Sequence, residues 1–202
     1  MQVDACRVGM LQTNCYLLYN DTTSILFDPG DEPGKITRLL GGREPDAIIV
    51  THHHHDHIGA LPDIVKATGA PVYASRIEAP KIVNPDPPEI YASMSYEPVE
   101  KVDVMLEDGE VFRIGDIELR AILTPGHTQG GICIYDEEDG LLFSGDTLFC
   151  GTHGRTDFPG GDAGQMIDSL KKLMELPDEV AVLPGHEALS TIGAERIWIE
   201  RL

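Results

Sequence analysis

The segment from Thr51 to His57 of this 202-residue chain reads THHHHDH and places five histidines and one aspartate within seven residues. Imidazole and carboxylate groups are common protein ligands of zinc, iron and manganese, so these residue types indicate a metal site. A purification tag is excluded because the run is internal, contains Asp56 and continues into the apolar sequence IGAL. A short buried strand is predicted at 46–50, directly before it, and α/β folds place their sites at strand ends.

The spacing within this run predicts two metal positions rather than one. Side chains of an extended chain alternate between its two faces, so His52 and His54 are expected on one side and His53 and His55 on the other. The aspartate and histidine that come next lie where the backbone is expected to turn into a helix. They therefore reach the same space from a second direction.

Three later turns repeat this arrangement, because each places one ligand-type residue in a glycine-containing turn after an apolar strand. A lone histidine or aspartate in a turn is ordinarily a surface or turn-forming residue. Three such turns in a chain that also carries the histidine run make chance a poor explanation. The three residues are His127 in TPGHT, Asp146 in SGDT and His186 in LPGH.

The elements that must position these residues are strands and helices spread over both halves of the chain. Turn signals such as Asp108-Gly109 and Asp139-Gly140 separate closely spaced strands and predict hairpins. This order favours two mixed sheets that face each other with helices outside. Strands are predicted at 2–8, 14–20, 23–28, 46–50, 71–74, 102–106, 111–114, 117–123, 131–135, 140–144 and 179–183, and helices at 34–41, 58–68, 163–175 and from about 193.

Length and composition favour one globular domain over residues 1–202, since 42% of the chain is hydrophobic and no low-complexity stretch interrupts it. No stretch approaches the ~20 apolar residues of a membrane span, and no signal peptide is evident, so a soluble cytoplasmic protein is expected. The net charge of −19 disfavours nucleic acid as a partner. The four cysteines form no CxxC pair, which indicates reduced thiols rather than a zinc ribbon or a disulfide framework.

Taken together, these motifs closely resemble the metallo-β-lactamase superfamily. Its signature THxHxDH is matched by Thr51, His52, His54, Asp56 and His57. The resemblance covers nearly the whole chain. It implies an α/β fold, an αββα sandwich of two mixed sheets flanked by helices, with the site at one edge of the sheets.

Three further segments are similar to one branch of that superfamily, the glyoxalase II-like hydroxyacylglutathione hydrolases. They are GDTLF at 145–149, GRTDFPGG at 154–161 and LPGH at 183–186. For this branch the resemblance implies hydrolysis of a small-molecule thioester by a hydroxide that bridges two metal ions. Two cations about 3.5–4 Å apart lower the pKa of a shared water from 15.7 toward about 7. The leaving thiolate is stable enough that no strong general acid is required.

The same resemblance implies a ligand set, carried over residue by residue. One metal ion is held by His52, His54 and His127, the other by Asp56, His57 and His186, and Asp146 bridges them. Asp56 also positions the nucleophilic hydroxide. Zinc is the expected metal, with iron and manganese as alternatives. His53 and His55 match no ligand position and are expected to support a ligand from behind or to face solvent.

Two segments outside this set carry candidate substrate contacts. Arg155 follows in a polar loop and is the candidate contact for an anionic substrate, with an internal ion pair to Asp157 as the alternative. Residues 84–98 contain four prolines and are read either as a substrate lid or as a surface loop. The candidate lid contacts are Tyr91, Met94 and Tyr96.

The end of the chain departs from the glyoxalase II pattern. The sequence stops soon after its last ligand position, so the helical segment that helps larger members bind glutathione is not expected, and no basic cluster for glutathione is evident. These two absences favour thioesters as a class over S-lactoylglutathione itself as the substrate. Glu187 follows His186 where the branch commonly has glycine. Trp198 is read as a packing or dimer contact, which leaves a homodimer open.

Three other functions compete with thioester hydrolysis. A persulfide dioxygenase would need one iron, held by His52, His127 and Asp146, but all seven ligand positions are filled and LPGHE differs from the PAHD-like segment of that group. A non-catalytic metal-binding module fits poorly, because structural zinc sites are closed, four-coordinate and often rich in cysteine. A nuclease of the same superfamily is disfavoured by the acidic charge.

Overall fold

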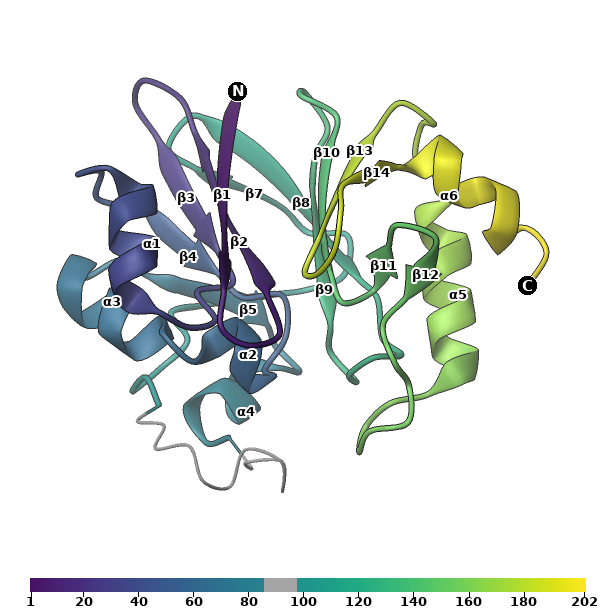
Figure 1. Cartoon of the computed structure of the whole chain (residues 1–202), viewed down its shortest axis with the longest axis horizontal. Coiled ribbons are helices and arrows are strands. Elements are labelled where there is room, and N and C mark those ends of the chain that lie inside the picture. Colours follow the sequence, from purple (N-terminus) through teal and green to yellow (C-terminus); the bar gives the residue numbers. More distant parts are fainter. Residues whose placement is uncertain (86–97) are drawn as a thin grey trace.

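Two six-stranded sheets packed face to face form the centre of the computed structural model, which describes residues 1–85 and 98–202 (Figure 1). The first sheet has the order β1-β2-β3-β4-β5-β6 and the second β14-β13-β10-β9-β8-β7. Both sheets are mixed, since β3 to β6 are parallel in the first and β10 and β13 are parallel in the second. A two-stranded ribbon, β11 with β12, lies beside them.

The bounds of these elements are as follows. The first sheet comprises β1 (Gln2–Val8), β2 (Thr13–Tyr19), β3 (Ser24–Phe27), β4 (Ala47–Ile49), β5 (Val72–Ser75) and β6 (Val104–Leu106). The second comprises β7 (Val111–Ile114), β8 (Ile117–Leu123), β9 (Ile132–Asp136), β10 (Leu141–Gly145), β13 (Ala181–Pro184) and β14 (Ser190–Thr191), and the ribbon is β11 (Leu148–Phe149) with β12 (Thr152–His153). The helices are α1 (Pro33–Leu40), α2 (His55–Ile58), α3 (Leu61–Thr68), α4 (Ala79–Val83), α5 (Ala163–Leu173) and α6 (Ile192–Ile199).

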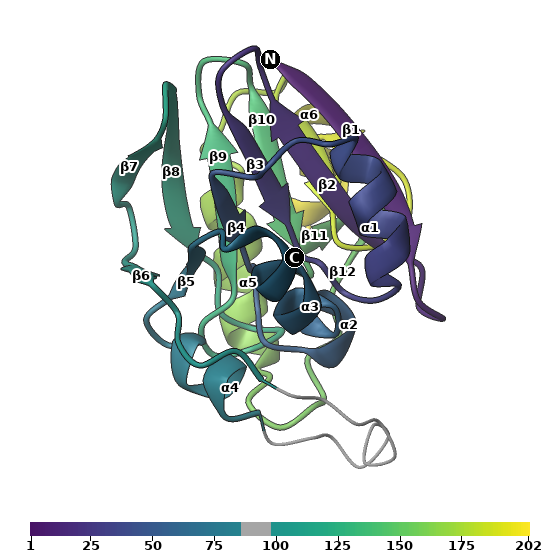
Figure 2. The same ribbon diagram turned by 90° about the vertical axis from the view of Figure 1, so that its left-hand side faces the viewer.

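Three apolar layers hold the fold together. The inner layer lies between the sheets, where the ring of Phe27 stacks on that of Phe143 with centroids 3.8 Å apart. A second layer packs α1 and α3 against the outer face of the first sheet, as the turned view shows (Figure 2). A third packs α5 and α6 against the second sheet. The order of layers is therefore helix, sheet, sheet, helix, and the predicted αββα sandwich is confirmed.

The predicted strands and most predicted helices lie within two residues of the observed bounds. The helix predicted at 58–68 is confirmed as α3 over Leu61–Thr68, but it begins three residues later than predicted, and Ile58 ends a separate short helix, α2, which was not predicted. Pro62 lies in the first turn of α3, where its missing N–H costs nothing, but inside a continuous helix its ring would clash with the carbonyl of Ile58. The short elements α4, β11, β12 and β14 were not predicted.

Strand direction brings the ligand-bearing turns to one edge of the sandwich. β8, β10 and β13 all run the same way, since β8 and β10 are each antiparallel to β9 and β13 is parallel to β10. Their carboxyl ends therefore meet. In the first sheet, β4 ends directly before the histidine run. In the described residues no helix is both long and apolar enough to cross a membrane.

Candidate metal centre

The seven predicted ligands lie together in one cluster at this edge. They form three overlapping groups, and within each group the ligand atoms lie within 4.8 Å of one another. The groups are His52, His54 and His127; His52, His57 and Asp146; and Asp56, His57 and His186. His53 and His55 belong to none of the groups found among the described residues.

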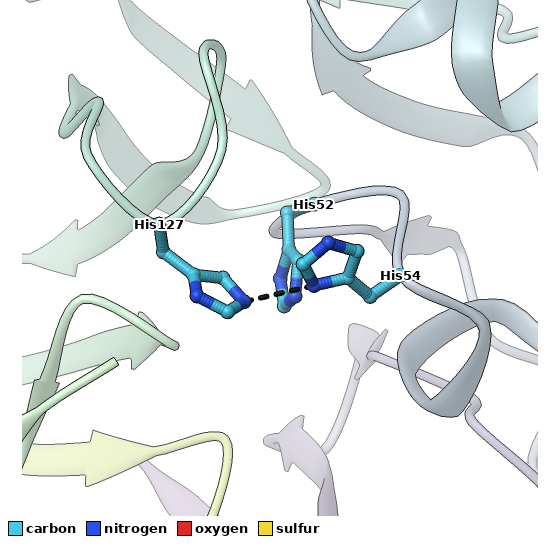
Figure 3. Close-up of side chains that lie close together, drawn as sticks. All are labelled: His52, His54 and His127. Atoms are coloured by element: carbon cyan, nitrogen blue, oxygen red, sulfur yellow. Dashed lines mark hydrogen bonds between the residues drawn. The ribbon is translucent and has the colours of Figure 1, made fainter. Parts of the chain in front are cut away.

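The first group combines two residues of the histidine run with a histidine from the turn after β8 (Figure 3). His127 Nε2 lies 2.8 Å from His54 Nδ1, so two ring nitrogens face each other directly. The ring centroid of His52 lies 4.8 Å from that of His54 and 4.9 Å from that of His127. As predicted from the alternation of an extended chain, His52 and His54 reach one space together.

Asp146 lies between the two ends of the cluster. Its Oδ1 is 3.3 Å from His57 Nε2, and its Oδ2 is 3.4 Å from His127 Nε2 and 3.5 Å from His186 Nε2. Oδ2 thus lies near one histidine from each end of the cluster, and a carboxylate in this position suits a bridging ligand. Gly185 makes room for it, because a Cβ at that position would overlap Asp146 Oδ1 and the His57 ring.

The third group, Asp56, His57 and His186, joins the first residues of α2 to the turn after β13. His186 Nε2 lies 3.1 Å from Asp56 Oδ2 and 3.4 Å from His57 Nε2. Thr13 donates a hydrogen bond of 2.9 Å to Asp56 Oδ2 and holds that carboxylate in place. The sequence places Asp56 and His57 at the start of a helix, and the first helical turn aims both at the cluster.

Four of the five imidazoles in the cluster are oriented through their Nδ1 atoms, which leaves Nε2 facing inward. This arrangement is the usual one for metal-binding histidine, since an acceptor at one ring nitrogen fixes the tautomer and frees the other nitrogen to coordinate. The Nδ1 partners are Thr51 Oγ1 for His52 at 3.1 Å, Asp28 Oδ2 for His57 at 2.9 Å, Arg155 O for His127 at 2.7 Å and Leu11 O for His186 at 3.1 Å.

The donor set fits divalent cations. His52 Nε2 and Asp146 Oδ1 are buried and make no hydrogen bond, which is costly for a polar atom that has no ligand to bind. Burial lowers the pKa of His52, and burial together with the nearby His127 lowers the pKa of His54 to about 3. Both imidazoles are therefore neutral and can donate an electron pair to a metal ion. Burial opposes ionisation of Asp56, but His57 outweighs it and lowers the pKa of Asp56 to about 2.

The carboxylates also favour positive charge at the third group, which contains His186. Burial alone would lower the pKa of His186, but the hydrogen bonds that its imidazole donates to Asp146 and Asp56 raise that pKa to about 9. The cluster therefore combines neutral imidazoles, His52 and His54, with ionised carboxylates, Asp56 and Asp146. Oxygen and nitrogen donors without thiolate suit zinc, iron or manganese.

His53, although adjacent to two predicted ligands, points away from the cluster and contacts Glu78. The imidazole Nδ1 of His53 is in hydrogen-bond contact with Glu78 Oε2, which also accepts the His53 backbone N–H at 2.9 Å. The other oxygen of Glu78 accepts the Gly130 N–H at 2.9 Å. Glu78 is fully buried and thereby ties the loop of the histidine run to the turn that carries His127.

A cavity of about 630 Å³ opens over the cluster. Apolar side chains of Leu11, Phe149 and Phe158 and the polar side chains of Arg7, Gln12 and Arg155 line it beside the metal-ligand residues. The ion pair of Arg155 with Asp157 is confirmed, and its contact with an anionic substrate stays a prediction. Its guanidinium forms two hydrogen bonds of 2.7 Å with Asp157, and it also borders the cavity. The predicted lid contacts Tyr91, Met94 and Tyr96 lie outside the described residues.

Two residues that support the site were not found from the sequence. Asp28 holds both Thr51 Oγ1, at 2.7 Å, and the ring of His57. The sequence shows Asp28 only as the residue that follows a strand. The pairing of β3 with β4 brings it beside Thr51, and the sequence does not reveal that pairing. Glu78 lies between two short elements without any motif, and no sequence signal points to it.

Comparison with known proteins identifies relatives along nearly the whole chain. Residues 8–186 match the family model of the metallo-beta-lactamase superfamily. The probable metallo-hydrolase YqgX of Bacillus subtilis (strain 168) is 38% identical over 184 residues, which cover 89% of this chain and 87% of that protein. The hydroxyacylglutathione hydrolase GloC of Haemophilus influenzae is 30% identical over 206 residues, which cover 97% of this chain and 95% of that protein.

Solved structures agree with the fold. The crystal structure of the BLEG-1 B3 metallo-beta-lactamase superimposes with a TM-score of 0.91 at 33% identity, covering 97% of both chains. That of TTHA1623 in a di-iron-bound form gives a TM-score of 0.84 at 37% identity, covering 95% of this chain and 96% of the other. A similar protein thus binds two iron ions.

Proposed function

This chain belongs to the metallo-β-lactamase superfamily, and on that premise we propose that it is a hydrolase of small-molecule thioesters, such as acylglutathiones, that uses two divalent cations. One observation carries the proposal. Seven nitrogen and oxygen donors from the histidine run and three distant turns converge on one cluster beneath an open cavity. A cluster with this many donors and without cysteine exceeds what a closed structural zinc site needs.

In this proposal His52, His54 and His127 hold one cation, Asp56, His57 and His186 hold the other, and Asp146 contacts both. When bound, the cations lower the pKa of a water molecule and polarise a carbonyl group, which together permit hydrolysis near neutral pH. Zinc is the expected metal, and iron or manganese suits the same donors.

The residues of the chain orient the ligands and hold the substrate. Thr13 fixes the Asp56 carboxylate, and Asp28 fixes the His57 ring, so the donors are positioned before substrate binds. Arg7 and Arg155 border the cavity and provide positive charge for an anionic thiol carrier. Phe158 packs against Arg155, whose guanidinium carbon lies 3.7 Å from the ring centroid, and steadies its position.

The identity to GloC supports the thioester class, because that relative is a hydroxyacylglutathione hydrolase. The segments GDTLF and GRTDFPGG support the same branch. A second candidate, β-lactam hydrolysis, is favoured by the similarity to the BLEG-1 enzyme, a B3 metallo-beta-lactamase. Both reactions cleave the bond between a carbonyl carbon and a heteroatom, so assays with each substrate class distinguish them.

The test combines metal analysis with parallel assays. The purified protein is loaded with zinc, iron(II) or manganese, its metal content is measured, and hydrolysis of S-lactoylglutathione, S-acetylglutathione and nitrocefin is followed. Two metal ions per chain and thioester hydrolysis are expected. His54→Ala and Asp146→Ala should reduce thioester hydrolysis to the background rate. His153→Ala, a histidine outside the cluster, should retain activity.

Three results would contradict the proposal. Full activity in either cluster variant would refute the site. Nitrocefin hydrolysis without thioester hydrolysis would assign the β-lactam reaction instead. One iron per chain, with oxygen uptake in the presence of glutathione persulfide, would assign a persulfide dioxygenase.

A further inference from the structure

A second cavity, of about 530 Å³, opens beside the first, at the edge of the sandwich where the two sheets come together. One wall is β1, and the other is formed by β10, β13 and the loop after β13. This loop runs down between the two sheets in Figure 1 and is anchored to β2, since Asn14 N donates to Gly185 O at 2.7 Å. We call this cavity the edge groove.

The walls of the edge groove are apolar. Val3 and Ala5 face it from β1, Leu141, Ala181 and Leu183 from the second sheet, and Leu189 from the loop. Leu189 is 60% exposed, and Val3, Leu141 and Ala181 are only partly buried at the margin of the inter-sheet core. The groove is therefore the open end of the core layer, and an apolar occupant would extend the packing that the core already has.

Two polar side chains that line the groove, Tyr16 and Asn14, are already bonded within the protein. Tyr16 donates its hydroxyl to Pro184 O at 2.8 Å. Asn14 Nδ2 donates to Pro184 O at 2.9 Å and to Glu187 O at 3.2 Å. A charged or amide-rich ligand would find few donors there, whereas a hydrocarbon chain requires none.

The edge groove continues the metal cavity. Arg7 and Glu187 line both cavities, and they are held together because Arg7 Nη2 donates to Glu187 O at 3.1 Å. Glu187 directly follows the predicted ligand His186, so the groove begins one residue from the metal cluster. The two residues thus form the border between the cavities, and a substrate with its carbonyl at the cluster can extend an arm across this border into the groove.

The dimensions suit a chain of moderate length. Val3 and Arg7 are four residues apart on β1, which spans about 13 Å at the usual rise of a strand. With C–C bonds near 1.5 Å in a zigzag, this length corresponds to about ten bonds of an extended hydrocarbon.

From these observations we propose that the edge groove binds the apolar acyl chain of the substrate, so that the enzyme acts on thioesters of medium-chain acyl groups. This inference rests on the proposed function and names its substrate class. The thiol carrier then lies on the other side of the scissile bond, in the metal cavity that Arg155 borders. The acyl chain passes Arg7 and Glu187 and lies along β1.

Two measurements test the groove, one of which does not depend on hydrolysis. Binding of 11-(dansylamino)undecanoic acid is followed by fluorescence in chelator-treated protein. Hydrolysis is compared for S-acetyl-, S-butanoyl-, S-hexanoyl- and S-octanoylglutathione with the zinc-loaded protein. Each methylene transferred from water to an apolar site contributes a factor of about four, so partial burial of six should favour octanoyl over acetyl by at least ~10-fold in kcat/KM.

The variants fill the groove from opposite walls. Ala5→Trp and Ala188→Trp should each lower the octanoyl-to-acetyl ratio by at least ~10-fold and weaken the fluorescent acid by a similar factor, because the indole occupies the space of the chain. Gln2→Trp, on the same strand but outside the groove, is the matched control and should leave both quantities unchanged.

Failure of the groove and failure of the proposed function give different results. Thioester hydrolysis with no preference for chain length, unaffected by either groove variant, would overturn the groove alone. Absence of thioester hydrolysis with every metal would overturn the proposed function, whatever the acid binds. A dimer in sedimentation that dissociates in Ala5→Trp would assign the groove to a second copy of the chain and overturn the inference.

Discussion

The imidazole of His57 bonds through Nδ1 to Asp28 Oδ2 at 2.9 Å, and the same carboxylate binds both the Thr51 N–H, at 2.8 Å, and the Thr51 hydroxyl. One buried side chain directly after β3 therefore fixes a predicted ligand of the second cation and the residue before His52. A carboxylate behind a metal-binding imidazole orients the ring and raises its basicity, and loss of such a partner typically costs 10–100-fold in metal affinity.

Asp28→Asn should therefore weaken zinc binding by about 10–100-fold. Asparagine suits the test because Asp28 has φ 47°, a left-handed conformation that asparagine adopts with little strain. Zinc affinity is measured by competition with a chromophoric chelator. Asp63→Asn, an exposed aspartate on α3, is the control and should bind as the original protein does. Unchanged affinity in Asp28→Asn would refute the role of Asp28.

The contact of Glu78 with His53 predicts a strong coupling between them. Glu78 is fully buried, and hydrogen bonds to charged groups contribute about 1.5–3 kcal/mol. Glu78→Gln keeps the shape and removes the charge, so it should lower the free energy of unfolding of the metal-free protein by about that amount. Urea unfolding measures this loss, with the exposed Glu100→Gln as the control.

A double-mutant cycle isolates the pair. His53→Gln alone should also destabilise the protein, but in the presence of Glu78→Gln it should cost less, with a coupling of about 0.5–3 kcal/mol. Strictly additive losses would show that the two side chains act independently. Zinc content should remain at the original value in His53→Gln, because its ring points away from the cluster toward Glu78.

The difference between Glu78 and the ligands shows what the sequence could reveal. His52 and His54 were placed together because the period of an extended chain is a local property. The turns that carry His127 and His186 were recognised from motifs, and strand direction then brought them to one edge. By contrast, Asp28 and Glu78 act through neighbours in space, which depend on the order of strands in the sheet and on a helix of five residues, α4.

The break between α2 and α3 had a local signal that hydrophobic spacing concealed. Apolar residues continue from Ile58 through Leu61 and Ile64 at helical intervals, so periodicity alone favours one helix. Pro62 opposes it, and the proline prevailed because a helix interior has no place for its ring. The small strands β11, β12 and β14 are two residues each, too short for any period to be visible.

Glu187 predicts a stabilising substitution. It has φ 69° in the left-handed region, where a side chain costs about 1–2 kcal/mol, which gives a physical reason why glycine suits this position. Against this gain, glycine has more conformational freedom in the unfolded chain, which lowers the free energy of unfolding by about 0.5–1 kcal/mol. Glu187→Gly should therefore raise the free energy of unfolding by roughly 0.5–1 kcal/mol in urea.

The neighbouring residue supplies the control for that substitution. Ala188 is not one of the described residues with a positive φ. Ala188→Gly therefore relieves no backbone strain and should destabilise the protein. Equal losses in both variants would show that the left-handed conformation of Glu187 carries no cost. Both measurements use metal-free protein, so that changes in metal affinity do not contribute.

Asp116 predicts a specific acid dependence of stability. Its carboxylate accepts hydrogen bonds from Thr23, at 2.6 Å, and from Asn20 and Thr22, each at 3.1 Å, and these lower its pKa to about 2. An unfolded aspartate titrates near ~3.9. Because the folded pKa is the lower one, the stabilisation is complete above about pH 4 and is lost as the pH falls toward 2.

Asp116→Asn removes this titration. The difference in urea midpoint between the original protein and the variant should be largest near pH 6, begin to shrink below about pH 4 and be smallest near pH 2. Thr23→Val removes the hydrogen bond that the Thr23 hydroxyl donates to Asp116. In that background the pH-dependent effect of Asp116→Asn on the urea midpoint should be smaller, because the folded pKa of Asp116 then moves back toward its unfolded value. A difference that stays constant from pH 6 to pH 2 would show that the hydrogen bonds to Asp116 do not favour its ionised form.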